Sequence, residues 1–501
     1  MPAPRPASKR AATPPARPEG PRPIAPARLK HGRPEMRRHV LRYRGPLTSR
    51  PDGTSWPRHR DTFRNAAGVA DGLLLPGKRK NADGLAARVG RGPDAVERFL
   101  RESPRDPDAV LRQLAEDLPA AYRDGPGFLV LDEVSEPADG DGVGVSRQYL
   151  GCLGKIDSGR VAVNLVYVRA GPRRNADQRT WPLGTRLVIP RARRGDAPRL
   201  DAQGVPDAAR TQTKGDVALG LLRAARGRNL PEGATALGDC EYGDNKDLRA
   251  QLRAWGTPYA LAVTPTEPRL VPAACPRRPR GRADPRARTP AEIAADPDAA
   301  WARVRRAEGT KGDRAPLEGD FRAVRVREAA GAAPKVPDEP GEPAPPEVAW
   351  LLLHRDPARG VRAWLCWHPD DAPDPANAPD PAWEHAPREV VERLAAQAGG
   401  RWPVEMFHRD IKQLLGYGAF EGRTWQGWHH HAAMVFLAYA FLAALRAGHD
   451  EAPGPLPTLQ DALRDVVRAD AARTLQHEHG MDPETARAVA ETVVRRYTDW
   501  G

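Results

Sequence analysis

Residues 401–412, RWPVEMFHRDIK, place one glutamate between two basic residues at intervals that suit chemistry on a helix. Arg401, Glu405 and Lys412 are separated by four and seven residues, which returns their side chains to one side of an α-helix. The same spacing is typical of a solvent-exposed helix face with weak ion pairs. The pattern therefore predicts a functional site only if other acidic residues converge on it.

Two such residues, Asp132 and Asp239, follow the short apolar runs GFLVL and TALG, which predict buried strands. Carboxylates that converge from different elements of a rigid scaffold are the ligands Mg²⁺ prefers, and a two-metal site can cleave phosphodiesters. Glu405 could complete a set of three. Pattern alone does not select these three from 65 acidic residues, because carboxylates at strand ends are also common helix caps and turn formers.

The balance of charge favours a polyanionic partner such as nucleic acid or an acidic membrane. The chain has 501 residues and a formal net charge of +13, and its length suggests about three domains. Residues 1–50 hold thirteen Lys or Arg, two Glu and eleven Pro. We therefore expect residues 1–45 to form a disordered basic arm, which could track a phosphate backbone or be a charged tail without a specific role.

The elements that must position the candidate residues begin after this arm. Residues 81–102 predict two short helices around a Gly-Arg-Gly turn, either a helix-turn-helix or an ordinary helical hairpin. From residue 121 we expect strands that end at Asp132 and Asp239, further strands at 160–170, 185–191 and 257–263, and helices near 214–228 and 244–256. This order predicts a mixed α/β sheet.

The remaining residues, 265–501, predict an insertion and a helical end. Residues 265–346 are rich in Pro, Arg and Ala, and residues 348–369 read as a strand hairpin. The apolar run from Ala432 to Leu445 has fourteen residues, short of the roughly 18 to 20 that cross a bilayer, so we expect a buried core helix and no membrane partner. No apolar segment of a secretory signal follows the basic start, and the dispersed cysteines predict neither a zinc site nor a disulfide framework.

Two clusters favour structural roles over chemical ones. His429, His430 and His431 are consecutive, and successive helix residues point about 100° apart, so they cannot converge on one ion. We expect them on the helix surface or near DNA. Trp350, Trp364 and Trp367 could stack on a base. Core packing of the predicted hairpin is the favoured interpretation.

Four segments of the chain resemble the DDE transposases of bacterial insertion sequences. LGDCEYGDNKDLRAQLRAWGTPYALAV at 237–263 resembles the block around the family's second aspartate, and VGVSRQYLGCLGKIDSGRVAVNLVYV at 143–168 resembles the block after its first. RWPVEMFHRDIK resembles the third block, with Arg, Glu and Lys at the family spacing. GTKGDR at 309–314 resembles a basic turn in the family's insertion, and together the similarities cover roughly residues 65–446.

This resemblance implies a ribonuclease H-like mixed sheet, a β-containing insertion before the last catalytic helix, and cut-and-paste DNA transposition with Mg²⁺, for which Mn²⁺ would substitute. It implies that Asp132, Asp239 and Glu405 form the catalytic, metal-binding triad. Arg401 and Lys412 would contact DNA phosphates. Four other residues are expected at DNA: Lys311 and Arg314 in the basic turn, and Arg147 and Gln148, which could equally brace the sheet.

The chain departs from the family pattern at two places. Val134 stands where a hydroxyl residue is expected after the first aspartate, with no Lys soon after it, and Ala398 replaces a Tyr before Arg401. A catalytically decayed DNA-binding protein derived from a transposase is therefore an alternative. A general nuclease is a third, less favoured one. Glu133 is an alternative ligand to Asp132, but adjacent strand residues face opposite sides.

The expected organisation divides the chain into six regions. They are a basic arm (1–45), a helical DNA-binding region (46–120), the first part of the catalytic core (121–264), the insertion (265–387), the second part of the core with the Glu helix (388–446) and a helical C-terminal region (447–501). The expected partners are double-stranded DNA, as terminal inverted repeats and target, and a second copy of the chain on paired ends. The expected location is the bacterial cytoplasm, at the nucleoid.

Overall fold

The computed structural model describes residues 32–48, 59–77, 80–90, 92–103, 105–125, 127–169, 179–275, 284–305, 318–329, 348–356, 360–371, 383–447 and 457–497. The strands are β1 (Gly127–Pro137), β2 (Ser146–Leu150), β3 (Lys155–Arg169), β4 (Arg179–Leu187), β5 (Thr235–Gly238), β6 (Tyr259–Val263), β7 (Leu270–Pro272), β8 (Ala302–Arg305), β9 (Glu318–Glu328), β10 (Ala349–Asp356) and β11 (Gly360–Trp367). The helices before β5 are α1 (Gly32–Arg42), α2 (Arg44–Thr48), α3 (His59–Leu74), α4 (Ala82–Val89), α5 (Pro93–Arg101), α6 (Pro107–Glu116), α7 (Ala197–Ala202), α8 (Asp207–Arg210) and α9 (Lys214–Ala225). Those after it are α10 (Cys240–Gly243), α11 (Lys246–Ala254), α12 (Pro290–Ala294), α13 (Arg388–Gly399), α14 (Pro403–Gln413), α15 (Trp425–Ala447), α16 (Leu459–His479) and α17 (Pro483–Tyr497).

All of these strands belong to one mixed sheet, as the sequence predicts for the α/β class. Its path is β2-β3-β1-β5-β6-β11-β10-β9-β7, with β4 on the far side of β3 and β8 beside β9. β1 is antiparallel to β3 and parallel to β5, and β5 is parallel to β6. In the parallel pairing Val130 lies opposite Leu237, so β5 ends level with the middle of β1.

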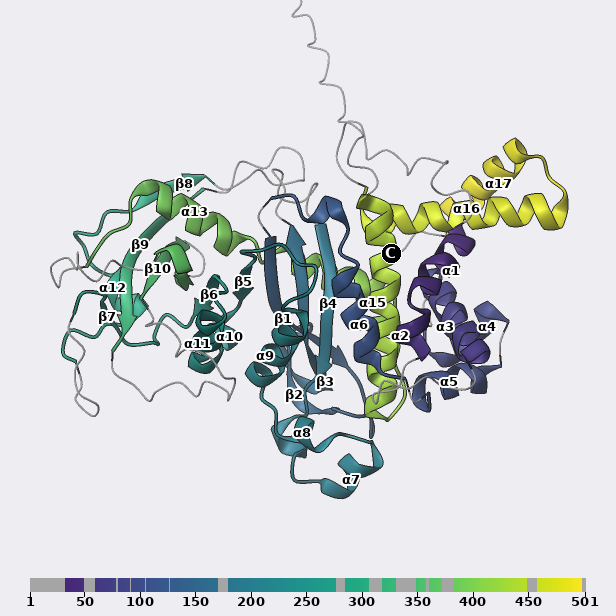
Figure 1. The fold of residues 1–501 in the computed structure, drawn as a ribbon, viewed down its shortest axis with the longest axis horizontal. Helices are drawn as coiled ribbons and strands as arrows, with labels where there is room; N and C mark the ends of the chain where they lie inside the picture. The colour runs from purple at the N-terminus through teal and green to yellow at the C-terminus, as the bar shows by residue number, and fades with distance from the viewer. Residues whose placement is uncertain are drawn as a thin grey trace, which may run out of the picture.

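The sheet is divided between a core and a β-rich lobe. Figure 1 shows β1, β3 and β4 at the centre, with the N-terminal helices on the side of α15 and the strands β7 to β10 on the other side. β3 is buried without interruption from residue 159 to residue 168, because α9 packs against it and its strand neighbours cover its edges. Alternation of exposed and buried residues is therefore absent from the strand that supports the candidate site.

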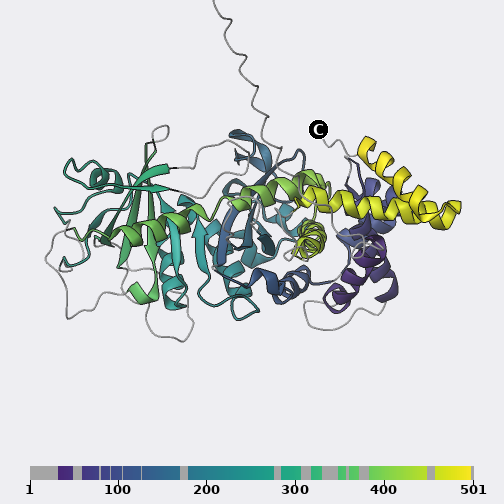
Figure 2. The ribbon, with the colours of Figure 1, turned by 90° about the horizontal axis from the view of Figure 1, so that it is seen from above.

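Helix α15 forms the spine of the helical part. It is long and apolar enough to cross a membrane, but 89% of its most apolar segment is buried inside the protein. It packs against β4, α3, α5 and α6, and Figure 2 shows it end-on beside the N-terminal helices. The prediction of a buried core helix is confirmed.

Two predictions about the fold are wrong. Asp132 does not end its strand, since β1 continues to Pro137. β5 pairs only with residues 128–130 of β1, whereas β3 pairs with the whole of β1 and carries the strand onward. Likewise, the part of the expected disordered arm from Gly32 onward is helical, because Met36, Val40 and Tyr43 lie at helical spacing and are fully buried.

Other element predictions hold with shifted ends. The helices α4 and α5 flank a turn at Gly90, which has a positive φ of 64° that glycine adopts without strain. The strand hairpin predicted at 348–369 is β10 and β11, paired from Trp350 with Cys366 to Asp356 with Gly360. The division into six regions stays a prediction, and residues 1–31 lie outside the described part of the chain.

Candidate active site

Asp132 lies in the middle of β1, where its buried carboxylate meets an arginine that is distant in the sequence. It stands opposite Asn164 of β3, and its side chain is 12% exposed. One carboxylate oxygen accepts a hydrogen bond from the backbone N–H of Glu133, and the other accepts one from Nη1 of Arg401 at 2.8 Å. This hydrogen bond joins residues 269 positions apart.

Asp239 follows β5 directly and begins the short helix α10. Its side chain accepts the backbone N–H of Glu241 at 3.1 Å, so it is the N-cap of that helix. β1 and β5 are neighbours, and the charge of Asp239 is one of the causes that raise the pKa of Asp132. Asp239 is therefore close enough to Asp132 for its charge to act on that carboxylate.

Glu405 comes from α14, which begins at Pro403 because a proline fits the first helical turn. Phe407 and Ile411 are fully buried on the face of α14 that packs toward α15. The opposite face carries Glu405, whose side chain is 54% exposed and pairs with Nη2 of Arg401 at 3.5 Å. Arg401 thus joins Asp132 and Glu405 through one guanidinium.

Burial is the main electrostatic feature of this site. It raises the pKa of Asp132 from 3.8 to about 7, and Asp239 adds to the shift while Arg401 opposes it. Burial also raises the pKa of Asp239, again against the effect of Arg401. Burial therefore disfavours the ionised forms of both carboxylates more than Arg401 favours them. An additional cation would stabilise their ionised forms.

Farther along α14, more polar side chains face β1 and β3. Lys412 donates from Nζ to the carbonyl of Ser135 at 2.8 Å. Burial raises the pKa of Glu136 on β1 to about 7, and the charges of Arg160 and Lys412 oppose this rise. We call Asp132, Glu136, Arg401, Glu405 and Lys412 the polar seam. Arg401 and Lys412, both predicted to contact DNA, are engaged within the protein in this structure. Their contact with DNA stays a prediction.

His408 belongs to the same helix face and was missed in the sequence. It lies three residues after Glu405, and its Nε2 is 3.1 Å from Nδ2 of Asn164, the residue opposite Asp132. Burial first, then Lys412 and Arg401, lower its pKa from 6.5 to about 3, so the ring is neutral. The i, i+3 spacing from Glu405 could have indicated it.

Glu133 points to the other face of β1, as the alternation of a strand predicts. It pairs with Lys214 of α9 at 2.8 Å, and Lys214 also contacts Glu241 at 3.3 Å. Tyr242 is fully buried close to this group, and its hydroxyl has no hydrogen-bond partner among the described residues. Sequence reasoning gave Lys214 and Tyr242 no role.

The remaining expected DNA contacts have different outcomes. Arg147 is exposed on β2. Gln148 donates to the carbonyl of Gly159 at 2.8 Å and braces the β2–β3 hairpin, one of its two expected roles. Lys311 and Arg314 lie outside the described residues.

The three consecutive histidines are not on the surface, so that prediction is wrong. His429, His430 and His431 are each at most 2% exposed, since α15 is enclosed on all sides. Their ring nitrogens contact the backbone carbonyls of Trp425, Leu100, Arg105 and Gly416. Trp350, Trp364 and Trp367 are also buried, at 4 to 6% exposure, as core packing predicts.

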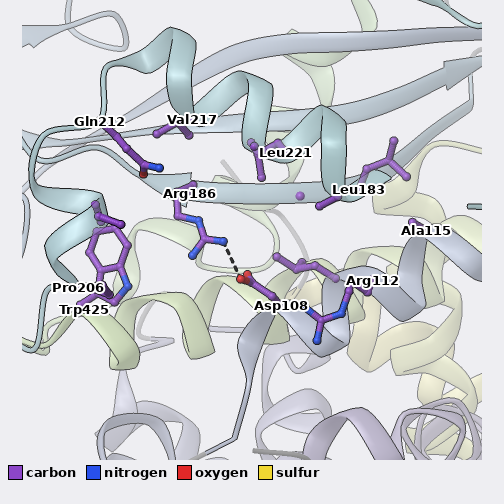
Figure 3. A pocket seen from close by; sticks show the side chains of 16 residues that line it. Asp108, Arg112, Ala115, Leu183, Arg186, Pro206, Gln212, Val217, Leu221 and Trp425 are labelled. Carbon is purple, nitrogen blue, oxygen red and sulfur yellow. Dashed lines mark hydrogen bonds and ion pairs between the residues drawn. The ribbon is translucent and has the colours of Figure 1, made fainter. Parts of the chain in front are cut away.

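Two cavities differ in their relation to these residues. One of about 270 Å³ is lined by Asp239, Arg401, Arg362 and Trp364, among others, beside the polar seam. The second, of about 300 Å³, lies between α6, β4 and α9 (Figure 3). Asp108 and Arg186 form an ion pair of 2.7 Å at its wall. No residue of the triad lines the second cavity.

A family model described as DDE superfamily endonuclease matches residues 46–330, more than half of the chain. The chain belongs to the DDE superfamily endonuclease family. The matched range includes Asp132 and Asp239 but ends before Glu405. The family match therefore does not reach Glu405, whose role in the site stays a prediction.

Other comparisons of this DDE superfamily endonuclease are more distant. A solved structure, the piggyBac transposase synaptic complex with hairpin DNA, is similar over 91% of this chain and 82% of that chain, with 10% identity and a TM-score of 0.38. No curated protein matches the chain.

Proposed function

We propose that this DDE superfamily endonuclease is a DNA transposase that cuts the ends of a mobile element and joins them to target DNA. The single observation that carries the proposal is the junction at Arg401. It connects Asp132 of β1, beside Asp239 at the end of the neighbouring parallel strand, to Glu405 of α14. In this proposal, carboxylates from three elements belong to one site, with Asp239 next to Asp132 and Glu405 linked to Asp132 through Arg401.

The donor set fits Mg²⁺ in its chemistry. Asp132, Asp239 and Glu405 would hold the ion, since hard cations take carboxylate oxygens, and Mn²⁺ would substitute. When bound, the ion would lower the pKa of a water or a DNA 3′-hydroxyl and stabilise the leaving oxygen. Among the described residues, no three His, Cys, Asp or Glu side chains lie close enough together to hold an ion. Loading therefore requires Glu405 to approach the aspartates and Arg401 to release them.

Residues of the chain have separate tasks in this proposal. His408, neutral and bound to Asn164, holds α14 against β3, the strand that pairs with β1 at Asp132. Lys412, held by Ser135, reduces the negative charge of the seam. Arg401 could move from the carboxylates to a DNA phosphate, because its side chain is 30% exposed.

Several finer statements belong to the same proposal. The ribonuclease H-like assignment is supported by the strand order β4-β3-β1-β5-β6, in which the first three strands are antiparallel and the last two join in parallel. We infer a cut-and-paste pathway of the bacterial insertion-sequence type, with a homodimer on paired terminal repeats, located at the nucleoid in the cytoplasm. The net charge of +13 supports a DNA partner.

The test is a nicking assay on a supercoiled plasmid that carries the element's own ends, with Mg²⁺ or Mn²⁺. We expect Asp132→Asn, Asp239→Asn and Glu405→Gln each to reduce cleavage by at least about a thousandfold, since each removes one ligand charge at the reacting phosphate. DNA affinity, measured by fluorescence anisotropy, should stay within about twofold of the parent, because no base contact is removed.

Glu478→Gln is the matched control, because this glutamate is exposed on α16 and far along the chain from the triad. It should cut like the parent. A triad variant that also cuts like the parent would show that the triad is misassigned. If the parent binds the ends but never cuts them, the second candidate function holds, a non-catalytic DNA-binding protein. The ion pair between Arg401 and Asp132 favours that alternative, since it occupies a carboxylate that metal binding would need.

A further inference from the structure

Large apolar side chains are concentrated on the surface at one hairpin. In the described part of the chain, five large hydrophobic residues are exposed, and three of them lie within eight positions. Tyr149 is 63% exposed, Leu153 43% and Ile156 58%. Single exposed apolar residues are ordinary, but a cluster marks a surface that binds something.

The hairpin presents these side chains in a defined geometry. Tyr149 and Ile156 are direct partners in the antiparallel pairing of β2 and β3, so they lie side by side on one face. Leu153 is in the turn between the strands, which closes with hydrogen bonds from the N–H groups of Leu153 and Gly154 to the carbonyl of Leu150, both at 2.9 Å. We call residues 147–156 the hairpin tip. Strand pairing and the hydrogen-bonded turn give the hairpin tip a defined shape.

The hairpin tip adjoins the candidate active site. The backbone N–H of Cys152 donates to Oγ of Ser135 at 3.0 Å, and the carbonyl of Ser135 accepts Nζ of Lys412 at 2.8 Å. Ser135 lies three residues after Asp132 on β1. A single residue of β1 therefore connects the hairpin tip to the polar seam.

Charge at the hairpin tip fits a polyanion. Arg147 is exposed on β2, and the side chain of Lys155 is 64% exposed. The acidic neighbour Asp157 pairs with Lys155 at 2.8 Å and leaves a net positive charge. Cations beside an aromatic and two aliphatic side chains match DNA, which offers phosphates next to apolar sugar and base surfaces. A second protein chain fits less well, because a stable interface needs about 800 Å² from each partner, more than three side chains provide.

We propose that the hairpin tip docks on duplex DNA beside the strand to be cut. Tyr149, Leu153 and Ile156 contact sugars and bases, and Arg147 and Lys155 contact phosphates. The inference rests on the proposed function for the identity of the ligand. It goes beyond that function by naming a surface outside the triad that would orient the DNA.

The experiment separates the apolar contacts from the charged ones by their salt dependence. The probe is a fluorescein-labelled DNA duplex of mixed sequence, with affinity measured by anisotropy over a range of NaCl. A variant with Tyr149→Thr, Leu153→Ser and Ile156→Thr should bind at least about tenfold more weakly, because its shorter side chains no longer pack on the sugars and bases. The slope of log affinity against log salt should not change, since the phosphates are still neutralised.

The charged pair should behave in the opposite way. Arg147→Ala with Lys155→Ala should reduce the magnitude of the salt slope by up to about two, one for each phosphate that is no longer neutralised. Val493→Thr is the control, because Val493 is 42% exposed on α17 and outside the hairpin tip, and it should bind like the parent. Tyr149→Thr alone, a strand-compatible change at an exposed position, should show a smaller decrease in affinity of the same kind.

The outcomes distinguish this inference from the proposed function. If the parent binds and nicks DNA while the triple variant binds as tightly as the parent, the hairpin tip proposal is wrong and the transposase proposal survives. If the triple variant keeps its DNA affinity but becomes a smaller oligomer by light scattering, the surface binds a second copy, which also overturns the proposal. If the parent neither binds nor nicks DNA, the proposed function itself fails and this inference fails with it.

Discussion

Two consecutive helices, α14 and α15, bury titratable side chains in opposite ways. In α15, the rings of His429, His430 and His431 each contact at least one backbone carbonyl at 2.8 to 2.9 Å, and burial lowers their pKa values. In the polar seam, burial raises the pKa values of Asp132 and Glu136 to about 7. Neither carboxylate oxygen of Glu136 has a hydrogen-bond partner among the described residues.

The difference separates structural polar groups from chemical ones. A neutral ring with a backbone partner is satisfied in the folded protein and needs nothing else. A buried carboxylate without a hydrogen bond is costly, and it persists where some other cation or proton completes it. We therefore expect the three histidines to affect only the stability of the fold. The stability of the polar seam should also depend on pH and on bound metal ions.

The largest change in unfolding free energy is expected from His430→Ala. The ring lies between the carbonyls of Leu100 and Arg105 and is fully buried. Its removal leaves a cavity and takes away the one N–H that the neutral ring can donate to these carbonyls, which together cost about 4 kcal/mol of unfolding free energy. Urea denaturation measures the change.

The control for this variant is His479→Ala, since His479 is exposed near the end of α16. That change should cost less than about 0.5 kcal/mol. Added Mg²⁺ should shift His430→Ala and the parent equally. If His430→Ala changed the stabilisation by Mg²⁺, the histidines of α15 would influence metal binding, and the contrast between the two helices would be wrong.

A second prediction concerns pH and Glu136, which is 4% exposed and 3.7 Å from Arg160. Burial raises its pKa from 4.5 to about 7, so the folded state binds its proton more tightly than the unfolded state does. Its contribution to stability is complete below pH 4.5 and is lost as the pH rises through 7. The loss is on the order of 3 kcal/mol at most.

The histidines have the opposite sign. The pKa of His431 falls from 6.5 to about 4, so its contribution is present above pH 6.5 and is lost as the pH falls toward 4. In Glu136→Gln, the unfolding free energy relative to the parent should rise as the pH increases from 4.5 to 7, and this difference should stay constant above about pH 8. Urea titrations at several pH values would contradict this if the difference in unfolding free energy between the two proteins stayed constant from pH 4.5 to 7.

The comparison also indicates what the sequence could predict. The face of α14 with Glu405 and the buried pair Phe407 and Ile411 follow from helical spacing and from Pro403, so the local geometry of the third block was predictable. Asp239 as the residue that follows a strand was also predictable, because a short apolar run stops there. Both predictions depend on neighbours a few residues away.

Other features depend on residues far apart in the chain. The extension of β1 past Asp132 comes from its pairing with β3, and the ion pair of Asp132 with Arg401 crosses 269 positions. The burial of the histidines follows from α5, α6 and β4 packing around α15. A helix that is apolar all round predicts a central position, and applying that rule to its first turns would have placed His429 inside.

The smallest effect on unfolding free energy is expected at Arg401. Its replacement tests whether this arginine competes with a metal ion for the carboxylates of the polar seam. The guanidinium binds Asp132 at 2.8 Å and Glu405 at 3.5 Å, and its side chain is 30% exposed. Because solvent screens part of this interaction, Arg401→Met should cost only about 1 kcal/mol without metal at pH 8. In the variant, Asp132 and Glu405 no longer have this internal cation. Mg²⁺ should then raise the urea midpoint more in the variant than in the parent, because binding need not displace the arginine.

Arg393→Met is the matched control. Arg393 lies on α13, pairs with Asp371 at 3.0 Å and forms no ion pair with a residue of the triad in the described part of the chain. Equal shifts by Mg²⁺ in the parent and in Arg401→Met would mean that Arg401 does not compete for the carboxylates. A response confined to Arg401→Met would identify this arginine as the cation that occupies the site before metal binds.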